Sequence, residues 1–68
     1  MSDINVDPVE YLYQQTLKLS EDQARFRKWI DLMNNAGENT TELEVTWKNN
    51  EAKIRRWKTA LAAEGKTF

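Results

Sequence analysis

Cysteine and histidine are both absent from this chain of 68 residues, and there are only two glycines and one proline. Without cysteine no disulfide can staple the fold, and without either residue the usual ligands of zinc, haem and copper are missing. The Ser–His and Cys–His pairs of nucleophilic catalysis are missing too, and there is no glycine-rich phosphate loop. We therefore expect no enzyme activity, no metal, no cofactor and no small-molecule substrate.

An excess of one charge and a long apolar run are also missing. Lys and Arg number 10 and Asp and Glu number 11, which gives a net charge of −1. Such a balance argues against a dedicated nucleic-acid binder. The first residues are acidic and polar, unlike a secretory signal, and no apolar run approaches the length of a membrane span. We expect a cytoplasmic protein, in a cell or in an infected host, without membrane contact.

The spacing of apolar residues predicts an all-α antiparallel hairpin of two helices, over about 8–34 and 41–64. In each segment mostly apolar positions recur at alternating steps of three and four, which is typical of a heptad seam. The two seams are Val9, Leu12, Thr16, Leu19, Gln23, Phe26, Ile30 and Met33, and Thr40, Leu43, Trp47, Asn50, Ile54, Trp57 and Leu61. Helices of similar length joined by a short loop favour antiparallel packing. The expected division of the chain is an acidic N-terminal tail (1–7), a hairpin domain (8–64) and a C-terminal tail (65–68), which we expect to fray or else to hook into a partner.

Capping residues support these boundaries. Asp7 precedes the proline and is typical of an N-cap, and Gly65 is placed to end the second helix. At the start of the second helix, Thr40 or Thr41 is the expected cap, with Glu44 completing a capping box with Thr41.

Two features leave alternatives open. The stretch from Ser20 to Gln23 is itself a capping-box pattern, so a break near Ser20 would give a three-helix bundle. Gln23 and Asn50 are polar residues that interrupt the seams. Either they are buried and fix the register of the two helices, or they lie where the seam widens and reaches solvent. The antiparallel register predicts Phe26 beside Asn50. Replacing Asn50 by Leu should raise the melting temperature and mix oligomeric states, and a lower melting temperature would mean that Asn50 makes a specific buried hydrogen bond.

Apolar residues also lie off the seams, where a lone hairpin would expose them. Large exposed apolar patches mark interfaces, and Trp and Tyr are frequent anchors there. We therefore expect self-association into a helical bundle, with a dimer forming a four-helix bundle as the simplest case. The predicted interface residues are Tyr13, Leu17, Trp29, Leu32, Val45 and Ala52.

Basic residues cluster in the middle of both predicted helices. They resemble a phosphate-binding surface, although helical basic runs are more often solvated faces with local ion pairs. An acidic protein partner is the other ligand that such a patch would suit. The predicted basic patch consists of Arg25, Arg27, Lys28, Lys48, Lys53, Arg55 and Arg56.

Together these features predict a small non-enzymatic protein-interaction module, acting as an adaptor, assembly factor or regulator. Its size is typical of accessory proteins of bacteriophages and mobile elements that bind a host protein. One alternative is a structural component of a larger particle, and another is a helical dimer that binds nucleic acid through the basic patch.

Overall fold

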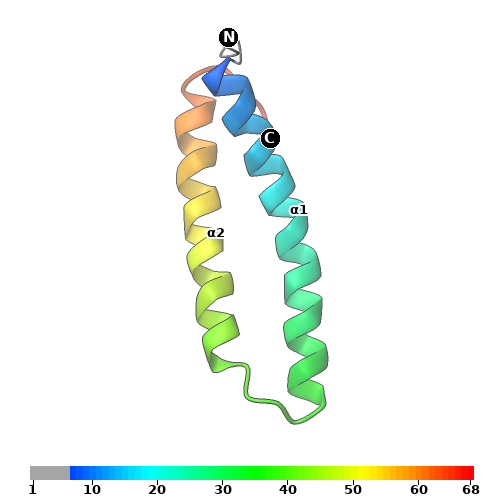
Figure 1. Cartoon of the computed structure of the whole chain (residues 1–68). Coiled ribbons are helices and arrows are strands. Elements are labelled where there is room, and N and C mark those ends of the chain that lie inside the picture. The colour runs from blue at the N-terminus through cyan, green and yellow to red at the C-terminus, as the bar shows by residue number, and fades with distance from the viewer. Residues whose placement is uncertain (1–6) are drawn as a thin grey trace, which may run out of the picture.

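The computed structural model describes residues 7–68, which form two antiparallel helices, α1 (Pro8–Asn35) and α2 (Thr41–Ala62) (Figure 1). Within that range there is no strand, and α1 packs against α2, which confirms the predicted helical hairpin. Helix α1 runs through Ser20 without a break, so the three-helix alternative is wrong. Apart from Asp7, the predicted N-terminal tail lies outside the described residues.

Local signals set three of the four helix ends. The Asp7 carboxylate accepts a hydrogen bond from the Val9 N–H at 3.0 Å, as its N-cap prediction requires. Both helices end in a turn through a glycine with positive φ, +89° at Gly37 and +92° at Gly65. The N–H after each glycine donates to the carbonyl five residues earlier, at 2.9 Å after Gly37 and 3.1 Å after Gly65. These are Schellman motifs, which favour glycine because other residues are strained at this φ.

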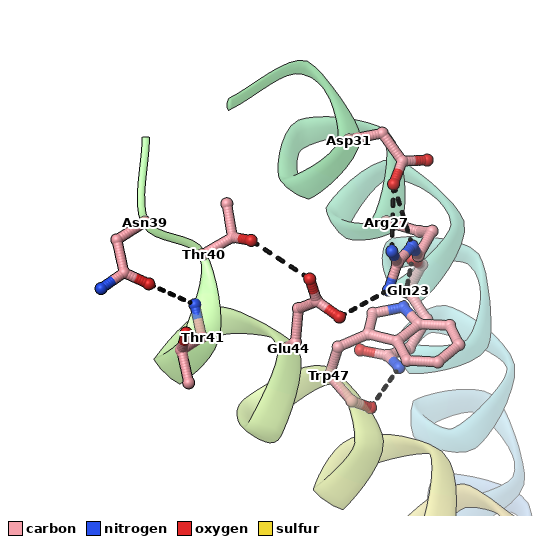
Figure 2. A network of polar contacts seen from close by, with 8 residues as sticks. All are labelled: Gln23, Arg27, Asp31, Asn39, Thr40, Thr41, Glu44 and Trp47. Atoms are coloured by element: carbon pink, nitrogen blue, oxygen red, sulfur yellow. Dashed lines mark hydrogen bonds and ion pairs between the residues drawn. The ribbon is translucent and has the colours of Figure 1, made fainter. Parts of the chain in front are cut away.

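The start of α2 differs from the predicted capping box. Thr40 takes the N-cap position, but its hydroxyl donates to the Glu44 carboxylate at 3.1 Å instead of capping the backbone. The backbone N–H of Thr41 donates instead to the side-chain oxygen of Asn39, at 3.0 Å (Figure 2). The Thr41–Glu44 box is therefore wrong, because Asn39 and Thr40 satisfy the groups that it would have joined.

The apolar core is thin. The buried hydrophobic residues in the described range are Ile30, Ile54 and Leu61, which are 0 %, 5 % and 3 % exposed. Thr16 is buried as well, and its hydroxyl donates to the Leu12 carbonyl at 2.7 Å. Because so few apolar side chains are fully covered, burial alone stabilises this helix pair only modestly.

A buried polar layer crosses the middle of the hairpin. The Gln23 side chain is 3 % exposed and donates to the Trp47 carbonyl at 2.9 Å and to the Glu51 carboxylate at 3.0 Å. Asn50 donates to the Gln23 side-chain oxygen at 3.1 Å, and the Trp47 indole donates to the Gln23 carbonyl at 3.0 Å. Gln23 thus takes the place beside Asn50 that the sequence predicts for Phe26.

Arg27 joins the two helices next to this layer. Its guanidinium bonds to Asp31 on the same helix at 3.0 Å and approaches Glu44 of α2 at 3.9 Å. It also lies over the Trp47 ring, with its central carbon 5.3 Å from the ring centroid (Figure 2). A cation held over an indole and between two carboxylates links α1 to α2 with more than one kind of interaction.

Candidate interaction surfaces

Among residues 7–68, the most exposed large apolar residue lies on the outer face of α1. Trp29 is 65 % exposed and Leu32 is 56 % exposed. Together with Arg25 and Lys28 they line a shallow hollow of about 180 Å³. These positions differ by three and four residues, so they share one face of the helix, which points away from α2 because Ile30 points toward it. We call Trp29 and Leu32 the outer face.

The other predicted interface residues do not join this outer face. Val45 is 54 % exposed and Ala52 is half-buried, seven residues further along α2. Since the side chains of Trp47 and Asn50 bond to α1, the spacing places Val45 on the far side of α2. The structure therefore separates the Val45–Ala52 pair from the outer face, and one flat contact with a second copy cannot cover both.

Tyr13 and Leu17, at the beginning of α1, form a third group, and both are half-buried. The Tyr13 hydroxyl donates to the Thr67 carbonyl at 2.7 Å, and its ring centroid lies 5.0 Å from that of Phe68. Tyr13 is thus already in contact with the C-terminal tail of its own chain.

This tail does not fray. It folds back over the beginning of α1 (Figure 1). There Lys66 Nζ lies 2.5 Å from Glu10 Oε1. Lys66 also lies 5.0 Å from the centroid of the Tyr13 ring, and Lys58 lies 5.4 Å from that of Phe68. The expectation of a frayed tail is wrong, because aromatic and ionic contacts with α1 hold it. We call these residues (Glu10, Tyr13, Lys66, Thr67 and Phe68) the tail clasp.

The ion pair of the tail clasp shifts the pKa of both of its partners. The hydrogen bond from Lys66, with a second from Gln14, holds the pKa of Glu10 below its ordinary value of 4.5. The same bond raises the pKa of Lys66 above its ordinary value of 10.5. Each shift favours the charged form, as expected when opposite charges meet at a surface.

The predicted basic patch is partly neutralised. Arg25 pairs with Asp22, and Arg27 pairs with Asp31 and Glu44. The remaining members are exposed and form no ion pair with another described residue: Lys28, Lys48, Lys53, Arg55 and Arg56. The two arginines therefore serve local structure, which weakens the resemblance to a phosphate-binding surface.

A larger hollow, which the sequence analysis missed, lies between the two helices in the half nearer the chain ends. Its volume is about 310 Å³. Most of its surface is apolar, and its charged lining residues are Lys18 and Asp22 of α1 and Lys53 of α2, which we call the rim. The seam pattern does contain a signal for it, since the small side chain of Thr16 takes a position between two leucines. We call this hollow the groove, lined by Leu12, Gln15, Thr16, Lys18, Leu19, Asp22, Lys53 and Trp57.

Within residues 7–68 no three acidic side chains come together as metal ligands would. Neither helix in this range is long and apolar enough to cross a membrane. The chain matches no known family model, no curated protein and no solved structure.

Proposed function

We propose that this protein acts by protein–protein contact, without catalysis, and that it forms a homodimer through the outer face. The observation that carries the proposal is the exposure of Trp29, 65 %, next to Leu32, 56 %, on one turn of α1. A tryptophan and a leucine side by side in water are costly for a monomer, and tryptophan is a preferred interface anchor.

The geometry of the outer face suits a twofold contact. If α1 of one copy packs antiparallel to α1 of another about a twofold axis that passes between Trp29 and Leu32, Trp29 of each copy meets Leu32 of the other. Such a contact is isologous, since the same patch is used twice. A stable interface buries about 800 Å² per partner, more than two side chains provide, so we expect a weak dimer that forms at micromolar concentration.

The thin core supports the same conclusion. Only three apolar side chains are buried in the described range, and a dimer would add a second apolar contact along α1. We propose that the resulting four-helix assembly serves as an adaptor, assembly factor or regulator. The polar surface around the outer face is then left for other proteins.

Sedimentation velocity from about 1 to 100 μM tests this proposal across the range expected for a small interface. The wild type should change from monomer to dimer, and Trp29→Ser should weaken the dimer at least tenfold because it removes the anchor. Tyr11→Ser is the matched control, since Tyr11 is also an exposed aromatic residue of α1, at 53 %. A wild-type chain that stays monomeric at every concentration and still unfolds cooperatively would contradict the proposal.

A further inference from the structure

The groove offers an apolar floor that nothing in the described chain covers. Leu12, Leu19 and Trp57 line it and are each half-buried, although they belong to the heptad seams. Its lining runs from Leu12 to Asp22 on α1, about three helical turns, and includes residues of α2, so it follows the helix pair lengthwise. A third helix laid along two antiparallel helices is the usual way in which such a floor is covered.

The floor has no buried polar atom that needs a hydrogen-bond partner from the occupant. The hydroxyl of Thr16 is bonded to the Leu12 carbonyl at 2.7 Å. In the described range no buried side-chain nitrogen or oxygen lacks a hydrogen-bond partner. The occupant should therefore present apolar side chains to the floor, because a polar group there would lose its water without gaining a bond.

The rim carries an unbalanced positive charge. Lys18 on α1 and Lys53 on α2 are exposed and pair with no described acidic residue. The acid on the rim, Asp22, is already engaged by Arg25. A helix with an apolar stripe between two acidic edges would complement both the floor and the rim.

Charge also argues against a second copy as the occupant. In a groove-to-groove twofold contact, Lys18 and Lys53 of one copy would face the same lysines of the other, and like charges across an interface are unfavourable. Nucleic acid fits the lysines but has no apolar stripe for the floor. We propose that the groove binds an acidic amphipathic helix of a partner protein and completes a three-helix bundle with it.

The three tryptophan indoles allow a direct test, because each reports on a different place. Trp57 lines the groove, Trp29 lies on the outer face, and the Trp47 indole is bonded to the Gln23 carbonyl. The ¹⁵N-labelled protein is titrated with a synthetic helix of about 18 residues that carries leucine at its a and d positions and glutamate at the flanking e and g positions. The Trp57 resonance should shift and saturate, while those of Trp47 and Trp29 change little.

Charge reversal gives the matched comparison. The double variant Lys18→Glu/Lys53→Glu should weaken peptide binding at least about tenfold, because two attractive contacts become repulsive. The control Lys48→Glu/Arg55→Glu makes the same change in net charge at exposed residues outside the groove, and it should change affinity less than about twofold. Circular dichroism confirms that both variants remain helical.

Several results would overturn the proposal. One is equal binding of a peptide with lysine in place of the flanking glutamates. Another is a shift of Trp57 on concentrating the protein alone, which would assign the groove to a second copy. A third is a shift of Trp57 with duplex RNA or DNA but not with the acidic peptide. A shift confined to Trp29 would reject the groove and leave the outer face as the binding surface.

Discussion

The polar layer around Gln23 and the tail clasp both hold together parts of the chain that are distant in sequence, and both do so largely with polar contacts. They differ in their access to water. Gln23 is 3 % exposed and its side chain makes three hydrogen bonds across the helix pair. In the tail clasp, by contrast, Tyr13 and Glu10 are only half-buried and Phe68 is 44 % exposed.

This difference in burial should decide how much each region contributes to stability. A hydrogen bond at the surface replaces one with water and adds little, whereas a buried group that loses its partner has no water to replace it. The layer should therefore behave as a cooperative part of the fold, and the tail clasp as a local contact that opens without unfolding the helices.

The change Gln23→Leu should have the largest effect. Leucine keeps most of the volume but removes all three side-chain bonds, and it leaves the Asn50 amide and the Glu51 carboxylate without their partner across the helix pair. We expect the free energy of unfolding to fall by about 2 kcal/mol, measured by urea denaturation. An unchanged midpoint would show that water replaces these bonds at no cost.

Asn50→Leu alone should destabilise the protein by about 1 kcal/mol, because the Gln23 oxygen loses its donor. The bond from Asn50 to Gln23 thus argues against the higher melting temperature that the sequence predicts for this replacement. The double variant Gln23→Leu/Asn50→Leu should recover much of the loss, since two apolar residues leave no mismatched partner between them. Strictly additive losses would mean that the two side chains act independently.

The same double variant tests whether the polar layer selects the register of the two helices. If polar pairing selects one register at a cost in stability, the double variant should be stable but should populate mixed oligomeric states in sedimentation. A single species of the wild-type size would show that the apolar contacts of Ile30, Ile54 and Leu61 suffice to set the register.

Local rules predicted the elements of the fold from the sequence. The cap at Asp7 and the turn at Gly65 depend on residues within one helical turn, and both are found. The capping box at Thr41 failed for an equally local reason, since Asn39 and Thr40 offered competing partners for the same groups. Periodicity showed which face of each helix turns inward but not how far the helices slide, and so Phe26 was placed where Gln23 lies.

Contacts between distant residues explain what the sequence did not show. The tail clasp joins Tyr13 to Thr67 and Phe68, and no spacing rule links positions so far apart. The groove was missed because periodicity marks Leu19 and Trp57 as seam residues without showing whether the facing side chains fill the space between them. The outer face was easier to find, because Trp29 and Leu32 break the polar pattern of the surface of a single helix.

The smallest effect on stability should come from the ion pair of the tail clasp. The pKa of Glu10 is lowered from 4.5, so its contribution is present above that value and is lost as pH falls through the lowered pKa. The pKa of Lys66 is raised from 10.5, so its contribution holds below that value and is lost as pH rises through the raised pKa. The pair should therefore stay closed across neutral pH.

Acid titration followed by NMR checks this behaviour at the rings of Tyr13 and Phe68, whose centroids are 5.0 Å apart. Their resonances should move toward free-tail values below pH 4.5 while the helical circular dichroism signal stays constant. Glu10→Gln should remove the acid transition and barely change the melting temperature, because an exposed ion pair contributes little to stability. If the helical signal fell at the same pH at which the ring resonances moved, the tail clasp would be part of the cooperative fold. Its greater exposure would then not make it less important for stability than the layer around Gln23.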